Sequence, residues 1–90
     1  MFISNKTYGD FLKEKREEAG MSQGQAAHKL GYSSAQFVSN VERGLSPPPK
    51  GVFFFLMKLY KVPDTAIVEF LAKAQREAVT AHLKLIKETD

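Results

Sequence analysis

Apolar side chains recur every three to four residues along most of this chain, which is the spacing of one face of a helix. Polar residues, glycines and prolines separate five such stretches. The pattern predicts an all-α protein with helices at about 7–19, 22–30, 34–43, 50–60 and 64–87. The longest uninterrupted apolar run, at 52–57, is far shorter than the roughly 20 residues that span a membrane.

The predicted helix ends rest on residues that cap helices. Thr7 is expected to cap the first helix, and Ser22 with Gln25 forms a capping box for the second. Ser33 or Ser34 is expected to cap the third. Three glycines are placed to end the first three helices: Gly20, Gly31 and Gly44. The three prolines at 47–49 are expected to be a stiff spacer rather than a ligand for a partner domain.

The last two helices predict an interface between subunits. Residues 52–57 are apolar nearly all round the fourth helix, which predicts burial on more than one side. The fifth helix carries an apolar stripe with heptad-like spacing and small residues in its middle, which predicts a homodimer. The expected interface residues are Ile67, Leu71, Ala74, Ala78 and Leu85. We therefore expect a domain at 1–62 and a dimerisation helix at 63–90.

Composition narrows the function classes. The chain has no cysteine, and its two histidines are far apart in sequence, so no disulfide, metal or other cofactor is expected. No nucleophile–base pair, carboxylate pair or phosphate-binding glycine loop is visible, so we do not expect an enzyme. No signal peptide is recognisable at the N-terminus, which predicts a cytoplasmic protein of bacterial or phage origin.

Positive charge is concentrated in the first two thirds of the chain. The net charge is +3, with an excess of four basic residues in 1–62 and of one acidic residue in 63–90. Between residues 20 and 62, five basic residues accompany Glu42 as the only acid. This distribution favours a polyanionic partner for the first part of the chain.

The second and third helices, joined by a tight turn, carry the most specific pattern. The third has small polar residues on one face and apolar residues on the other, as a helix that enters the major groove of DNA does. Over about 7–62 the chain resembles the phage-repressor and Cro-like helix-turn-helix family. The matching segments are 20–23, Ala27, 29–31 and 41–44. The resemblance implies a lambda-repressor-like helical bundle that binds double-stranded DNA.

The resemblance also implies roles for individual residues. An arginine of the first helix pairs in such proteins with the glutamate after the third, and the matching residues are Arg16 and Glu42. The matching glutamine, Gln23, binds phosphate in the family and can brace the recognition helix. Its place at the start of a helix also suits a phosphate oxygen.

The register of the third helix has two interpretations. The stretch after Gly31 has one residue more than most family members show, and we place the extra residue in the turn. With Val38 and Val41 turned inward, the expected base-contacting residues are Ala35, Gln36, Ser39 and Asn40. The expected phosphate-contacting residues are Gln23, Ser34, Arg43 and Lys50. Anchoring at Gly31 instead would emphasise 33–35.

Phe37 has two interpretations in this register. It fills the space left by Ala26, where a larger residue is usual in the family, or it contacts a thymine methyl group. We favour the first.

The expected function is a transcriptional regulator, a repressor that binds an inverted-repeat operator as a homodimer. The alternative is an antitoxin that binds a toxin through the C-terminal helix and represses its own promoter. The heptad-like spacing of 67–85 fits self-association and a protein partner equally well.

Overall fold

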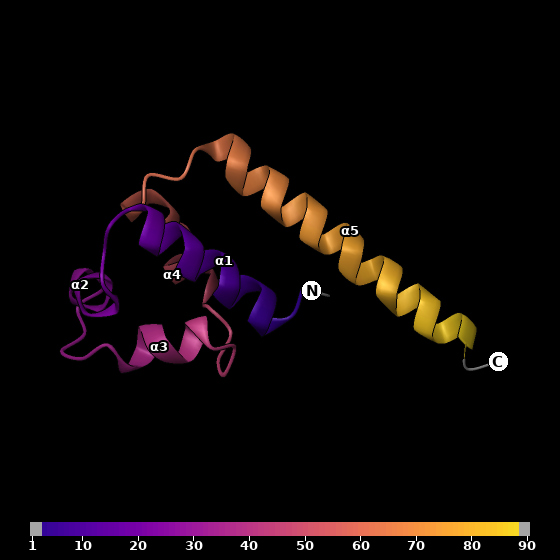
Figure 1. The fold of residues 1–90 in the computed structure, drawn as a ribbon, viewed down its shortest axis with the longest axis horizontal. Helices are drawn as coiled ribbons and strands as arrows, with labels where there is room; N and C mark the ends of the chain where they lie inside the picture. Colours follow the sequence, from indigo (N-terminus) through magenta and orange to yellow (C-terminus); the bar gives the residue numbers. More distant parts are fainter. Residues whose placement is uncertain (1–2, 89–90) are drawn as a thin grey trace.

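The protein is built from five helices. The computed structural model describes residues 3–88, and no strand occurs in that range. The helices are α1 (Asn5–Glu18), α2 (Gln23–Lys29), α3 (Gln36–Glu42), α4 (Lys50–Leu59) and α5 (Asp64–Glu88). Figure 1 shows α1 to α4 gathered into a bundle, with the long α5 running past it and beyond it. The predicted all-α class and the long C-terminal helix are confirmed.

Local sequence fixes several of the helix ends as predicted. The Ser22 hydroxyl accepts from the Gln25 backbone N–H, and the Gln25 side chain accepts from the Ser22 N–H, which completes the capping box. Gly20, Gly31 and Gly44 have φ values of 72°, 91° and 78°. Side chains other than glycine rarely adopt this left-handed conformation, so the chain can leave each helix sharply there.

Two predicted caps are wrong. Ser4, not Thr7, is the N-cap of α1, and its hydroxyl accepts from the Thr7 backbone N–H. Both residues are good caps, and α1 takes the earlier one. The third helix starts at Gln36, with Ala35 as N-cap and no side-chain cap. The Ser34 hydroxyl accepts a 3.4 Å hydrogen bond from the Gln36 N–H, so this serine shapes the turn before the helix.

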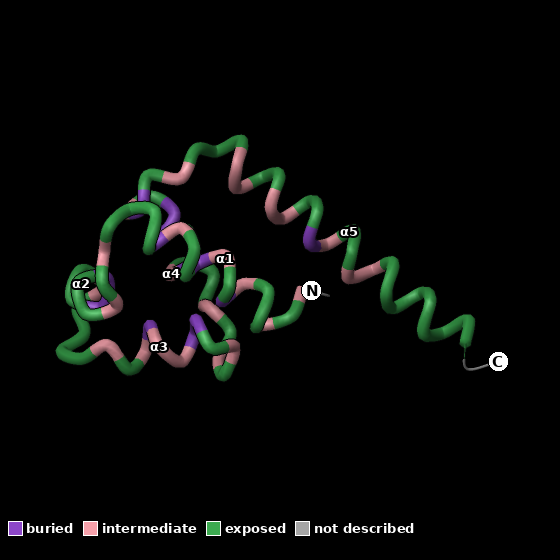
Figure 2. Tube along the Cα trace, viewed as in Figure 1, coloured by how far each residue is buried: buried purple, intermediate pink, exposed green. Residues whose placement is uncertain are grey.

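The core lies between α1, α2, α3 and α4. Its buried members are Leu12, Ala26, Ala27, Val38, Val41, Phe53, Leu56, Met57 and Tyr60. In Figure 2 the buried positions of α3 lie on its side toward α1. Val38 and Val41 point inward, which fixes the opposite face of α3 outward. On α4, which is apolar nearly all round, Phe54 and Phe55 remain exposed.

The start of α5 belongs to the same core. Phe70 stacks on Phe11 of α1 at 3.8 Å between ring centroids, and Ile67 and Leu71 pack against the buried cluster. Every residue of α5 from 80 to 88 is exposed (Figure 2). Core packing thus continues past residue 62, where we expected a domain boundary. None of the helices in the described range is long and apolar enough to cross a membrane.

The hydroxyl of Tyr60 gives a first testable prediction. It is buried and has no hydrogen-bond partner within residues 3–88. Burial raises the pKa of Tyr60 to about 12. We expect Tyr60→Phe to leave the free energy of unfolding at pH 7 unchanged, or to raise it by up to about 1 kcal/mol, because no bond is lost.

The same variant has a pH signature. The unfolded chain loses the tyrosine proton near pH 10, whereas the folded protein holds it to about pH 12. The stability of the wild-type protein should therefore fall as the pH rises through this window, and Tyr60→Phe should fall less. Urea unfolding between pH 7 and 12 measures both effects. A large loss at pH 7 would mean that the hydroxyl does have a partner.

Candidate nucleic-acid interface

Two small residues let α2 and α3 pack closely. Ala26 and Ala27 are almost completely buried, so no long side chain separates the two helices. The chain turns at Gly31, and the Tyr32 N–H donates back to the Ala27 carbonyl at 3.0 Å. The result is a short helix, a tight turn and a second short helix held across it (Figure 1).

A buried polar network ties the end of α3 to α1 and α2. Arg16 Nε donates to Glu42 Oε2 at 2.7 Å, and Arg16 Nη2 donates to Glu42 Oε1 at 3.0 Å. Gln23 Nε2 donates to the same Oε1 at 2.9 Å. Arg16 Nη1 also donates to the Met21 carbonyl at 2.6 Å. The two residues that the family resemblance pairs are therefore joined by a two-pronged salt bridge, the strongest common geometry for such a pair.

This network is largely buried and pairs one basic side chain with one acidic side chain. Glu42 is 4% exposed and Arg16 is 7% exposed. Hydrogen bonding to Glu42 raises the pKa of Arg16 above its usual value, even though burial acts in the opposite direction. Both oxygens of the Glu42 carboxylate accept hydrogen bonds inside the protein.

A glycine brings α1 directly against the end of α3. A Cβ on Gly9 would lie 2.4 Å from the Val41 carbonyl oxygen and 2.6 Å from that of Glu42. A Cβ on Gly44 would lie 2.9 Å from the Cα of Lys6. The two backbones thus touch where most helices are separated by side chains, which holds α3 at a fixed angle to the bundle. Sequence reasoning did not identify Gly9.

The outer face of α3 carries a short hydrogen-bond chain. Gln36 Nε2 donates to Asn40 Oδ1 at 2.8 Å, and Arg43 Nη2 donates to the same oxygen at 3.2 Å. The side-chain carbonyl of Asn40 therefore orients two neighbouring side chains, Gln36 and Arg43. The carbonyl of the Gln36 amide and the NH₂ group of Asn40 are not used in these bonds, and an adenine edge offers partners for both kinds of group.

The other predicted residues of the recognition face lie in α3 or just before it. Ala35 and Ser39 are half-buried, and Ser34 is exposed in the turn. Phe37 is half-buried, packs against the core and stacks on Tyr32 at 4.8 Å between ring centroids. This position agrees with a gap-filling role for Phe37.

A polar hollow of about 360 Å³ lies beside the end of α3. Its lining residues are Gln23, Glu42 and Arg43 together with three residues of α1, Lys6, Asp10 and Lys13. Lys6 is paired with Asp10, and Lys13 is exposed. Sequence reasoning missed both lysines as site residues. Their spacing of seven, two turns of one helix, was the available signal, but only the fold places α1 beside Arg43.

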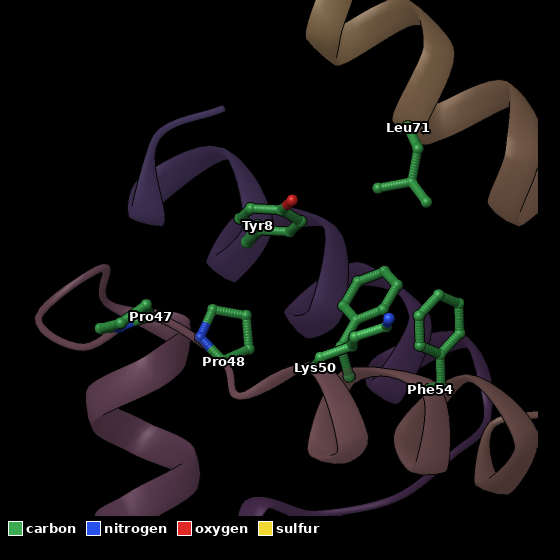
Figure 3. Close-up of a pocket in the computed structure, with 7 residues that line it drawn as sticks. Tyr8, Pro47, Pro48, Lys50, Phe54 and Leu71 are labelled. Carbon is green, nitrogen blue, oxygen red and sulfur yellow. The ribbon is translucent and has the colours of Figure 1, made fainter. Parts of the chain in front are cut away.

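Lys50 lies elsewhere. It begins α4 and lines a separate, mainly apolar groove of about 300 Å³ with Tyr8, Pro47, Pro48 and Phe54. Figure 3 shows this groove between the proline segment, α1, α4 and Leu71 of α5. The structure therefore does not bring Lys50 into the hollow that holds Gln23 and Arg43.

The structure places the residues of the expected dimer stripe on α5 in different environments. Ile67 and Leu71 contact the core of their own chain, and Ala74 is buried. Ala78 is half-buried, and Leu85 is exposed. We call this set of five residues, from Ile67 to Leu85, the inner stripe.

No group of three or more potential metal ligands occurs in the described part of the chain.

Comparison with known proteins agrees with this geometry. Searches of curated proteins and of solved structures gave no match. A family model described as a helix-turn-helix domain matches residues 7–70, which is more than half of the chain. This range includes all of α1 to α4, except the first two residues of α1, and the part of α5 that packs on the core. The chain therefore belongs to the helix-turn-helix domain family of DNA-binding proteins.

Proposed function

We propose that this protein is a sequence-specific transcriptional regulator of the phage-repressor and Cro-like kind, which represses by binding an inverted-repeat operator as a homodimer. The recognition helix is α3. The observation that carries the proposal is the contrast between its two faces: Val38 and Val41 are buried with Glu42 clamped by Arg16, while Gln36 and Asn40 stand together on the outside.

Polar and basic side chains lie at both ends of α3, where they suit the phosphate backbones on the two sides of a DNA groove. Lys13, Arg43 and Gln23 converge beside its C-terminal end, and the Ser34 hydroxyl lies before its N-terminal end. Phosphate contacts of this kind position a protein on DNA, and base contacts supply the sequence preference. Ala35 and Ser39 complete the proposed base-contacting set, with the alanine suited to a thymine methyl group.

Gln36 and Asn40 are expected to be the main readers of base identity. Gln36→Ala or Asn40→Ala should each cost roughly 1–3 kcal/mol on the true operator and much less on random DNA. Asn40→Ala should cost more, because its carbonyl also holds Gln36 and Arg43 in place. An operator selected from random sequence, followed by titration of each variant, measures this.

Thr80→Ala is the matched control, since it removes an exposed polar group from α5. Half-site centres in the selected DNA should be about one helical turn, roughly 34 Å, apart. Alanine variants at 36 and 40 that keep full discrimination would refute the roles of these two residues.

Lys13 is expected to act on phosphate. Lys13→Ala should weaken binding to all sequences about equally and reduce the slope of log affinity against log salt by about one. Lys50→Ala, the matched lysine from the groove of Figure 3, should have a smaller effect. Binding titrations over a range of salt concentrations test this. If Lys50→Ala has the larger effect, the backbone runs over the start of α4 instead.

A further inference from the structure

The solvent side of α5 carries a second apolar stripe. Its residues are Val68, Ala72, Val79 and Leu83, called here the outer stripe: the first three each follow an inner-stripe residue by one position, and Leu83 lies about one turn beyond Val79 on the same face. One residue is about 100° around a helix, so the outer stripe lies roughly a third of a turn away from the core. Val68 is 66% exposed and Leu83 is 51% exposed, so the fold of one chain does not cover either of them.

The positions in the outer stripe are symmetric along the helix. The steps between them are four, seven and four residues, so the spacing is the same from either end. In an antiparallel pair of α5 helices, Val68 of each copy lies opposite Leu83 of the other. Ala72 then lies opposite Val79. Each larger side chain meets an apolar neighbour, and the alanine allows close approach between the helices.

The charge distribution along α5 also favours an antiparallel pair. The charged residues of 64–72 are Asp64 and Glu69, both acidic. Residues 73–88 carry four basic side chains against two acidic ones, including Lys84 and Lys87 near the end. Antiparallel pairing places the acidic beginning of each helix beside the basic end of the other, whereas parallel pairing would place like charges together.

We propose that the outer stripe of α5 binds the outer stripe of a second copy of this chain in antiparallel orientation. The inference rests on the homodimer of the proposed function and moves its interface from the inner stripe to the outer one. The inner stripe keeps its contacts with the core. The two α5 helices begin roughly 35 Å apart in this pairing, at 1.5 Å per residue, close to one turn of DNA. The two helix-turn-helix domains therefore lie at opposite ends of the helix pair.

Cysteine cross-linking tests the register directly, because the full chain contains no cysteine. A disulfide needs two Cα atoms within about 7 Å. A mixture of the Val68→Cys and Leu83→Cys chains should form a disulfide-linked heterodimer several-fold faster than either variant alone forms a homodimer. Efficient linkage of either variant with itself, and none in the mixture, would overturn the antiparallel register.

Sedimentation of two matched variants tests the choice of stripe. Leu83→Glu should weaken self-association by tenfold or more, whereas Leu85→Glu, a similarly exposed leucine on the inner stripe, should leave it nearly unchanged. Loss of association in Leu85→Glu alone would place the interface on the inner stripe. A wild-type chain that remains monomeric at high micromolar concentration would overturn the inference altogether.

Binding to a single half-site separates this inference from the proposed function. Leu83→Glu should keep its affinity for a half-site and lose affinity for the complete inverted repeat. A dimer that forms as described but binds no DNA would contradict the proposed function and leave the interface standing. A monomer that still binds the half-site would contradict the interface and leave the proposed DNA recognition standing.

Discussion

Glu42→Ala is expected to destabilise the protein by roughly 3–5 kcal/mol, because it leaves the buried guanidinium of Arg16 without its partner. A loss of this size is a large part of the stability of a small domain. The Gln23 side chain loses its acceptor in the same variant. Urea unfolding followed by circular dichroism measures the free energy of unfolding.

Two further variants keep this prediction testable if Glu42→Ala does not fold. Glu42→Gln keeps the shape and one acceptor oxygen, so we expect a smaller loss than for the alanine variant. Replacing both charges, as in Arg16→Met with Glu42→Leu, removes the unpaired ion and should recover much of the stability. Glu18→Ala is the control, since its salt bridge with Lys15 is exposed and should contribute less than about 1 kcal/mol.

The same variants separate stability from DNA recognition. The salt bridge joins α1 to the end of α3, and Gln23 joins α2 to the same carboxylate. A double variant that is stable but apolar at these positions lacks the fixed geometry of the two-pronged pair. We expect it to bind its operator more weakly than the wild-type protein while unfolding at a similar urea concentration. Equal affinity would show that packing alone positions α3.

Local chemistry explains why most helix ends could be predicted from the sequence. The Ser22–Gln25 capping box and the left-handed glycines at 20, 31 and 44 act within a few residues of chain, so their effect is visible without the fold. The error at the start of α1 has a local cause too. Ser4 and Thr7 are three residues apart and both suit an N-cap, and propensity alone does not choose between them.

Contacts between distant segments could not be predicted in this way. Periodicity shows that α5 has apolar residues, but two adjacent stripes satisfy it, and the stacking of Phe70 on Phe11 decides which one faces the core. Lys13 and Arg43 line the same hollow only because α1 lies beside the end of α3. The Arg16–Glu42 pair was suggested by family resemblance, since a charged run surrounds Arg16 and gives it no local distinction.

Gly9 is the most instructive omission, because a glycine inside a predicted helix is usually read as a weak point. Glycine costs a helix interior roughly 0.5–1 kcal/mol relative to alanine. Here the missing side chain is what allows α1 to touch the last carbonyls of α3. A contact between two backbones leaves no apolar pattern in the sequence, so nothing in the periodicity of α1 indicates it.

Gly9→Ala is therefore expected to destabilise the protein, by about 1–3 kcal/mol or somewhat more, although alanine is the better helix former. The added methyl group would lie 2.4 Å from one backbone oxygen and 2.6 Å from another, and neither can move without displacing α3. Gly24→Ala and Gly51→Ala are matched controls on α2 and α4. Neither has an atom closer than 3.9 Å to the new Cβ, so each should stabilise by about 0.5–1 kcal/mol.

The three alanine variants are best compared by thermal unfolding and by titration with operator DNA. In Gly9→Ala, separation of α1 from α3 would also move Lys13 away from Arg43, so operator affinity should fall even where the protein remains folded. The two controls should bind as the wild-type protein does. If Gly9→Ala instead stabilised the chain to the same extent as Gly24→Ala, the two helices would have room between them. The close contact that fixes the angle of the recognition helix would then be absent.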